Sequence, residues 1–270
     1  MYLMEKKRPL DGSLGARLWL LAGLVLVVSA CASRSPEAEF AELASSPWAL
    51  ESATVAGPVA AWRHHAFPGK RPSIYRYARL DGRDAVLVRA ASSASMLRHT
   101  VRIEPGQLGQ LRFSWKVPAL ITAADLSARD KSDSPVRIVL AFEGDRSRFS
   151  ARDALLSELA HALTGEPMPY ATLMYVWSNR GEPGTVVENP RTGRIRKMLL
   201  EAGPGKLGQW LDYERDVNAD FVKAFGEPPG ALVAIGIMTD TDNTKSTTQA
   251  WYGPVRHVRA ATPDRTLAEQ

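Results

Sequence analysis

Apolar and polar residues alternate with a period of two through most of the chain after residue 50. Leu111, Phe113 and Trp115 alternate with polar neighbours, which predicts a strand with one face in a core. Residues 98–104 alternate in the same way. The Glu-Pro-Gly sequence at 104–106 is a turn signal between these two runs. The two runs are therefore predicted to pair as antiparallel strands.

Nine further short segments have the alternation or the apolar content of strands. They are 73–80, 84–90, 136–142, 170–177, 185–188, 194–200, 209–217, 232–238 and 249–258. Segment 170–177 is apolar on both faces, which predicts a central strand whose second face is covered. Eleven short strands separated by turns predict a mainly β protein, an antiparallel β-sandwich of the jelly-roll-like kind.

Two short helices interrupt the strands. The first is predicted to begin after the N-cap Ser150 and to end before Gly165, and the second to span 218–225, with Asn218 as its cap. Residues spaced by four positions share one face of a helix, and an apolar face is expected to pack on the sandwich. Three leucines of the first helix have this spacing: Leu155, Leu159 and Leu163.

The N-terminus has the pattern of a bacterial lipoprotein signal peptide. Four basic residues precede an apolar run at 18–30, which is too short for a comfortable membrane span. The run ends at Val28-Ser29-Ala30, followed by Cys31. A small residue directly before a cysteine suits lipoprotein processing, so Cys31 is predicted to carry the lipid anchor. An ordinary secretory signal with a fortuitous cysteine is the alternative.

These features predict four regions. Residues 1–30 are the signal peptide, and 31–50, rich in Ala, Ser and Glu, are a tether. Residues 51–260 are the β-sandwich domain, and 261–270 are a C-terminal tail. In a Gram-negative cell, the resemblance to lipoproteins implies that Ala32 after the cysteine favours sorting to the outer membrane, so the domain is expected to face the periplasm.

Composition excludes several classes of site. Cys31 is the only cysteine, so the chain has no internal disulfide, no cysteine zinc site and no catalytic thiol. The net charge of +5 falls to +3 when the four basic and two acidic residues of 1–30 are removed. Such a small excess argues against nucleic acid as a partner. A basic cluster is interpreted as a solvated hairpin face, with contact to anionic lipid as the alternative; its residues are Arg191, Arg194, Arg196 and Lys197.

An acidic segment directly follows the apolar run 232–238. Asp240, Asp242 and Asn243 offer the hard oxygen ligands that Ca²⁺ takes, although the EF-hand spacing is absent. A calcium site here would need another ligand, such as Asp133 or Glu143. The alternative is a hydrogen-bonded turn between two core strands.

A second candidate site combines a charged loop with aromatic residues. Asp133 and Arg137 are predicted to form an ion pair, unless this loop is simply solvated. Flat aromatic rings beside amide and carboxylate groups are typical of carbohydrate sites, and core placement of at least one ring is the alternative. The ring and amide candidates are Trp177, Asn179, Trp251 and Tyr252.

The chain contains none of the common enzyme motifs: no G-x-S-x-G elbow, no H-E-x-x-H and no P-loop. A glycosidase needs two opposed carboxylates. Four residues are candidates for such a pair: Asp133, Glu143, Asp240 and Asp242. The sequence does not place any two of them across a cleft, so an enzyme is the less favoured interpretation.

The chain from about residue 113 to 258 resembles DUF3047, a bacterial family of proteins of unknown function. The matching segments are Phe-Ser-Trp-Lys-Val at 113–117, Asp-Ser-Pro-Val-Arg-Ile at 133–138, Leu-Met-Tyr-Val-Trp at 173–177, Met-Thr-Asp-Thr-Asp-Asn-Thr at 238–244 and Ala-Trp-Tyr-Gly at 250–253. The resemblance implies no activity. It does imply that these segments recur together and meet in space. Pro254 stands where an acidic residue is expected in relatives, which weakens any metal role at that turn.

The sequence therefore predicts a membrane-anchored periplasmic module that binds a glycan, such as a polysaccharide or peptidoglycan. A carbohydrate-active hydrolase or lyase and a structural envelope protein are the alternatives. An open concave surface shared by Asp133, Arg137, Asp240, Asp242 and Trp251 would favour binding or catalysis. Burial of these side chains in pairs would favour a structural role.

Overall fold

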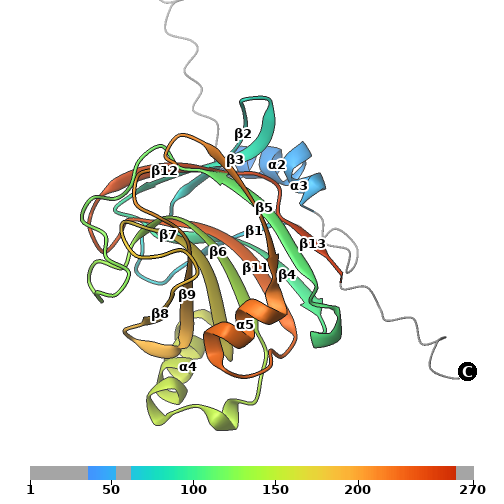
Figure 1. The fold of residues 1–270 in the computed structure, drawn as a ribbon, viewed down its shortest axis with the longest axis vertical. Coiled ribbons are helices and arrows are strands. Elements are labelled where there is room, and N and C mark those ends of the chain that lie inside the picture. The colour runs from blue at the N-terminus through green and yellow to red at the C-terminus, as the bar shows by residue number, and fades with distance from the viewer. Residues whose placement is uncertain (1–35, 53–61, 260–270) are drawn as a thin grey trace, which may run out of the picture. The chain divides into compact units, whose positions relative to one another are not determined.

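The strands form two stacked sheets (Figure 1). The structure is a computed structural model and describes residues 36–52 and 62–259. One sheet has seven strands, in the order β1 (Arg63–Ala66), β4 (Ser95–Ile103), β11 (Leu232–Asp240), β6 (Ser134–Phe142), β7 (Ala171–Ser178), β9 (Thr192–Ala202) and β8 (Val186–Asn189). The other has six: β10 (Trp210–Asp216), β5 (Gln110–Lys116), β12 (Thr247–Tyr252), β3 (Arg83–Ala91) and β2 (Ile74–Leu80), with β13 (Arg256–Val258) also paired to β5. Within the described ranges, β7 and β9 pair in parallel and the other pairs are antiparallel. The prediction of a mainly β, jelly-roll-like sandwich is confirmed.

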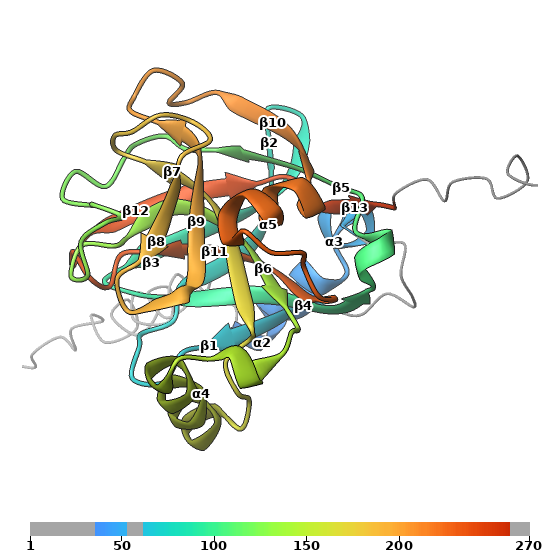
Figure 2. The same ribbon diagram turned by 60° about the horizontal axis from the view of Figure 1, so that its bottom comes forward.

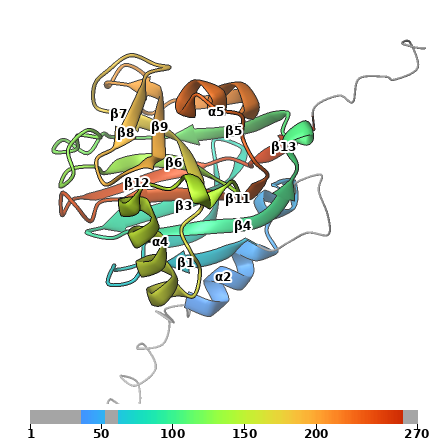
Figure 3. The same ribbon diagram turned by 90° about the horizontal axis from the view of Figure 1, so that it is seen from below.

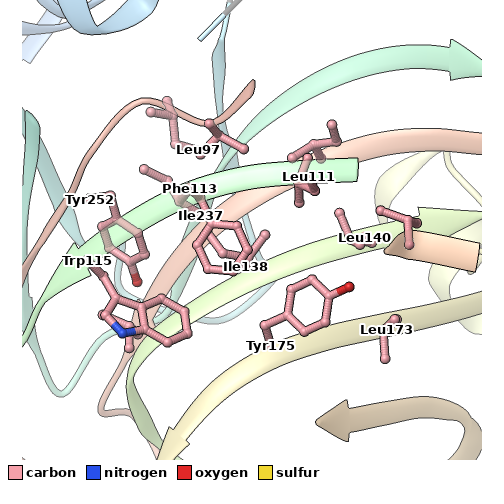
Figure 4. Close-up of a cluster of buried hydrophobic side chains, with 14 of the residues drawn as sticks. Leu97, Leu111, Phe113, Trp115, Ile138, Leu140, Leu173, Tyr175, Ile237 and Tyr252 are labelled. Atoms are coloured by element: carbon pink, nitrogen blue, oxygen red, sulfur yellow. The ribbon is translucent and has the colours of Figure 1, made fainter. Parts of the chain in front are cut away.

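The hydrophobic core lies between the two sheets (Figure 4). Alternation places every second residue of a strand in this layer. On β6, Ile138 and Leu140 are fully buried between the sheets, so Arg137 lies on the outer face of the seven-stranded sheet. Phe113 and Trp115 of β5 meet them from the six-stranded sheet. The central position predicted for 170–177 is confirmed, since β7 lies between β6 and β9.

The predicted pairing of residues 98–104 with 111–117 is wrong. β4 lies in the seven-stranded sheet, whereas β5 lies in the six-stranded sheet. A short 3₁₀ turn, Pro105–Gln107, carries the chain from one sheet to the other. The turn signal was correct, but a turn can join two layers as well as two neighbours in one sheet.

Helix α4 (Ala151–Thr164) has the predicted ends. Its N-cap Ser150 accepts a hydrogen bond from the Asp153 backbone N–H, and Gly165 adopts the left-handed conformation that ends the helix, with φ 76°. Helix α5 (Val217–Phe225) has its N-cap two residues earlier than predicted. Asp216, rather than Asn218, is its N-cap.

The face of α4 that contacts the domain is the opposite of the predicted one. Asp153 and Ser157 are buried, while the leucine side is in solvent; the exposed fractions are 70% for Leu155, 53% for Leu159 and 61% for Leu163. Asp153 accepts a hydrogen bond from Thr192 of β9, which holds this polar side inward. Figures 2 and 3 show α4 at the rim of the sandwich, away from the space between the sheets.

Replacing Leu159 by Gln is therefore expected to change the free energy of unfolding by no more than about 0.5 kcal/mol, as at other exposed positions. Urea unfolding followed by circular dichroism measures this. Leu43→Gln is the control, because Leu43 is a fully buried helical leucine. A loss above about 1 kcal/mol for Leu159→Gln would mean that the leucine side of α4 is packed after all.

Residues 36–52 are folded against the sandwich, although they fall largely within the segment 31–50 that was predicted to be a tether. They form α2 (Pro36–Ala44) and α3 (Pro47–Glu51), and Leu43 and Trp48 are fully buried in the core. No helix within 36–52 and 62–259 is long and apolar enough to cross a membrane. The predicted signal peptide, the lipid anchor at Cys31 and the tail at 261–270 lie outside the described residues.

Candidate functional site

The acidic segment continues directly from the end of β11 and meets the start of β6 across the seven-stranded sheet. Asp240 pairs in register with Ser134. Its carboxylate accepts two hydrogen bonds from Arg137, Nε to Oδ1 at 2.7 Å and Nη2 to Oδ2 at 3.1 Å, and one from the Ser134 backbone N–H. The side chains of Arg137 and Asp240 are only 3% and 6% exposed. Burial raises the pKa of the Asp240 carboxyl, and the Arg137 guanidinium opposes this shift.

Asp133 does not form the predicted ion pair with Arg137. It is instead the centre of a second group of hydrogen bonds. Its carboxylate accepts hydrogen bonds from the backbone N–H groups of Asn243 and Thr244, from the Asn243 amide at 2.8 Å and from the Thr244 hydroxyl at 2.6 Å. Four donors to one buried carboxylate fix the turn after β11 on the loop before β6. This is the hydrogen-bonded turn that the sequence offered as an alternative.

The three carboxylates of Asp133, Asp240 and Asp242 have oxygens within 4.8 Å of one another. Calcium would need several of these oxygens at once. The Asp240 carboxylate is ion-paired with Arg137, and the Asp133 carboxylate accepts hydrogen bonds from backbone and side-chain donors. The Lys70 ammonium lies 2.5 Å from the Asp242 carboxylate. The Asn243 amide presents its nitrogen, not its oxygen, to this group. The carboxylate oxygens of this cluster, with these partners, do not fit a calcium site.

We therefore expect the melting temperature of the protein to be the same in millimolar calcium and in chelator. A ligand that binds only the folded state must raise the melting temperature. Differential scanning calorimetry with and without calcium, with magnesium as the matched salt, makes the comparison. A rise specific to calcium would restore the calcium prediction.

Lys197 was assigned to the solvated basic cluster, and that interpretation is wrong. Its side chain is buried, and its Nζ donates to the Leu126 carbonyl at 2.8 Å and to the Ser132 hydroxyl at 2.7 Å. Burial lowers the pKa of Lys197 to about 7, and the positive charge of Arg137 adds to the shift. Lys197 thus holds the loop before β6 on the outer face of the seven-stranded sheet. Two members of the cluster are ion-paired, Arg194 with Glu227 and Arg196 with Glu188.

The lowered pKa predicts a pH dependence. Between about 7 and 10.5 the unfolded chain holds a proton on Lys197 that the folded chain does not. Stability from this group therefore rises with pH across that window, by up to about 1.4 kcal/mol per pH unit. Urea midpoints from pH 6.5 to 9 should rise more steeply for the wild type than for Lys197→Met. Parallel curves would contradict the assignment.

Three of the remaining sequence candidates have structural contacts. Trp177 is 1% exposed, and its indole N–H donates to the Gly203 carbonyl. Asn179 donates to the carbonyls of Ile121 and Ala124. Tyr252 is fully buried, and its hydroxyl donates to the Met238 carbonyl. These three side chains donate to backbone carbonyls, and the buried Asp240 is paired with Arg137, which favours a structural role for this region.

Trp251 lies apart from them, on the outer face of the six-stranded sheet. Its neighbours Ala250 and Tyr252 point into the core, so alternation directs Trp251 outward, where it is half-buried. Register places five residues of five adjacent strands in one row across this face: Arg76, Leu87, Trp251, Lys116 and Trp210. We call this outer surface the Trp251 face. Trp210 was not among the candidates predicted from the sequence, although it lies at the start of a segment that alternates like the others.

The Trp251 face is hollowed on both sides of Trp251. One hollow, of about 610 Å³, includes Arg83, Arg112 and Asp212. The other, of about 660 Å³, includes Ile74, Arg89 and Gln249. From Arg83 to Ala91 the strand β3 spans roughly 26 Å at about 3.3 Å per residue, and Leu87, the partner of Trp251, is its midpoint. The two hollows and the ring between them form an extended surface of mixed polarity.

The carboxylates proposed for hydrolysis do not face one another across either hollow. Asp133, Asp240 and Asp242 lie in the bonded network described above. Glu143 is exposed at the other end of β6, where it accepts hydrogen bonds from Arg102. The geometry therefore gives no support to the paired-carboxylate alternative.

Comparison with known proteins gives one family match. The family model described as "Protein of unknown function (DUF3047)" matches residues 60–256. A search among curated proteins found no match.

Several solved structures share a distant likeness. A family 11 carbohydrate-binding module from Clostridium thermocellum, in complex with a mixed-linked tetrasaccharide, is 8% identical and has a TM-score of 0.35, with 74% of this chain and 89% of that chain covered. The xyloglucanase domain of NopAA from Sinorhizobium fredii is 10% identical with a TM-score of 0.37, and 74% and 93% are covered. Endoglucanase 3 from Trichoderma harzianum is 9% identical with a TM-score of 0.35, and 69% and 83% are covered.

Proposed function

The chain belongs to the DUF3047 family, and we propose that it binds glycans through the Trp251 face as a lipid-anchored module of the bacterial envelope. The observation that carries this proposal is the position of Trp251. A half-buried indole stands at the middle of an exposed sheet surface, with a hollow on each side. An aromatic ring held in this way offers a flat surface for a sugar ring.

The surroundings of Trp251 suit a polar, extended ligand. Lys116 beside it is ion-paired with Asp81, and Arg83 lies over the Trp210 ring at 5.4 Å, so both cations are held in place. Gln249 and Thr247 lie on the same face of β12 and offer amide and hydroxyl groups to sugar hydroxyls. A surface of roughly 26 Å between Arg83 and Ala91 has room for several sugar units. Rings with polar neighbours on an open surface support binding rather than catalysis.

The membrane part of the proposal rests on residues 1–31. The basic residues, the apolar run and the small residue before Cys31 support cleavage and lipid attachment. Several acyl chains on one residue hold a protein firmly on a bilayer. The domain would then act at the periplasmic side of the outer membrane. Cys31→Ala should move the protein from the membrane fraction of cells to the soluble fraction, and retention in the membrane would contradict the anchor.

A binding array tests the glycan proposal. The chain from residue 31 onward, with Cys31→Ser to remove lipidation, is applied to peptidoglycan fragments, lipopolysaccharides and neutral and acidic polysaccharides. At least one saccharide should bind, and Trp251→Ala should weaken that binding by about 30-fold or more, as expected for a central aromatic contact. Leu159→Ala is the control, because it removes an exposed apolar side chain on a different surface. Absence of any saccharide ligand, or equal binding by Trp251→Ala, would overturn the proposal.

A further inference from the structure

The two hollows of the Trp251 face differ in charge. The hollow near Arg83 contains four carboxylates beside its arginines: Glu51, Asp84, Asp212 and Glu214. The hollow at the other end contains Arg71 and Arg89 and, within 36–52 and 62–259, no carboxylate. We call this second one the Arg89 hollow. Its charge is positive, whereas the charges of the first hollow are mixed.

Among the described residues, Arg71 and Arg89 also differ from the other arginines of this face in having no ion partner. Arg76 is paired with Glu39, Arg83 with Asp212 and Arg112 with Glu214. Among residues 36–52 and 62–259, no carboxylate oxygen lies within 4.0 Å of the guanidinium of Arg71 or Arg89. Both residues are exposed, so their donors face solvent in the hollow.

The walls of the Arg89 hollow suit one or two sugar units. Register places Arg89 between Ile74 and Gln249 on the neighbouring strands. Ile74 is 48% exposed and Leu120 is half-buried, so the hollow offers apolar side chains beside its hydrogen-bonding groups. Trp251 follows Gln249 by two positions on the same face of β12. A unit stacked on Trp251 would therefore place its neighbour in the hollow.

We propose that the Arg89 hollow recognises an acidic sugar unit, so that the glycan bound by the Trp251 face is an anionic polysaccharide. Guanidinium groups bind carboxylate and phosphate oxygens in pairs of parallel hydrogen bonds, and the two arginines supply such donors without competition from protein carboxylates. The charge of the ligand is carried by uronate carboxylates or by phosphate groups. This inference rests on the proposed glycan binding and adds its specificity.

Matched pairs of polymers test the inference. The unlipidated chain is titrated with polygalacturonate and with galactan, and with phosphomannan and neutral mannan. An acidic polymer should bind at least 10-fold more tightly than its neutral partner in 50 mM salt, and the difference should shrink as salt rises. Whichever acidic polymer binds more tightly identifies the group that carries the charge.

Variants locate the effect. Arg89→Gln and Arg71→Gln should each weaken binding of the acidic polymer by about 10-fold and leave that of the neutral polymer unchanged. Arg102→Gln is the matched control, an exposed arginine of the seven-stranded sheet, outside the Trp251 face, that is paired with Glu143. Circular dichroism melting checks that the variants fold.

Three outcomes distinguish the proposed acidic specificity from the proposed glycan binding on which it rests. Equal affinity for acidic and neutral polymers, with loss in Trp251→Ala, would overturn the acidic specificity and keep glycan binding. Preference for the acidic polymer that survives both Arg→Gln changes, or that Arg102→Gln reduces equally, would place the charge recognition elsewhere. Binding of no polymer at all would overturn both proposals.

Discussion

Replacing Arg137 by Met is expected to lower the free energy of unfolding by about 3–5 kcal/mol at pH 7, because it leaves the buried carboxylate of Asp240 without its partner. The same change removes the hydrogen bond from Arg137 Nη2 to the Ser132 carbonyl. Methionine fills a similar volume, so the loss reports the charge and the hydrogen bonds rather than a cavity. Urea unfolding followed by circular dichroism measures it.

The deficit of Arg137→Met should shrink at acidic pH. Burial already raises the pKa of Asp240, and removal of the guanidinium raises it further. A carboxyl whose pKa is higher in the folded protein than in the unfolded chain binds its proton more tightly in the folded protein. The free energy of unfolding is therefore not reduced by this group at pH values below 3.8, its ordinary pKa, and it falls as the pH rises above that value. The variant should therefore lie closer to the wild type at pH 4 than at pH 7.

Two further variants complete this test. Arg137→Met combined with Asp240→Asn should recover much of the lost stability, because no buried charge then remains. Arg112→Met breaks an exposed ion pair with Glu214 and should have at most a slight effect. A loss for Arg137→Met no greater than that for Arg112→Met would show that the buried pair is not a structural centre.

The partner of Arg137 shows what the sequence could not predict. A carboxylate four residues away, that of Asp133, was the expected partner, whereas the actual one is Asp240, 103 residues away. Local patterns identify strands, but they do not say which strands become neighbours. The meeting of Asp133 with the turn at 241–244 was implied by the recurrence of both segments in one family.

The same limit applies to strand pairing and to helix faces. The alternation of Leu111, Phe113 and Trp115 predicted a strand with its core face correctly, yet nothing in it distinguished a partner in the same sheet from one in the opposite sheet. The ends of α4 followed from Ser150 and Gly165, because caps are local. Its buried side depended on Thr192, which lies in another element.

Alternation along the strands explains which aromatic candidates are buried in the core and which face outward. Trp177 follows Leu173 and Tyr175 on the core side of β7, so its burial follows from alternation. Trp251 and Tyr252 are adjacent, so one of them had to face outward, and only the register with β3 and β5 shows what lies around it. Arg71 and Arg89 carried no signal in the sequence. Their significance is that no carboxylate of the described part of the chain lines their hollow, and that depends on the fold.

Trp48→Ala is expected to lower the free energy of unfolding by about 3–5 kcal/mol, the usual cost of removing a large buried aromatic side chain. Trp48 is fully buried in α3, and its ring lies 5.0 Å from that of Trp62. The turn after α3 is held as well, because the Ser52 hydroxyl accepts a hydrogen bond from the Val255 backbone N–H. If residues 31–50 were a tether, the same change would have no effect on the domain.

Leu50→Ala is the matched control for Trp48→Ala, since Leu50 lies in the same short helix and is 62% exposed. Both variants are compared with the wild type by urea unfolding, in the chain that begins at residue 31. A large loss for Trp48→Ala and almost none for Leu50→Ala would show that the domain begins at α2. The stretch between Cys31 and the first residue of α2 would then be only four residues long, and a lipid on Cys31 would hold the folded domain close to the membrane surface. Equal unfolding midpoints for both variants and the wild type would instead restore the tether.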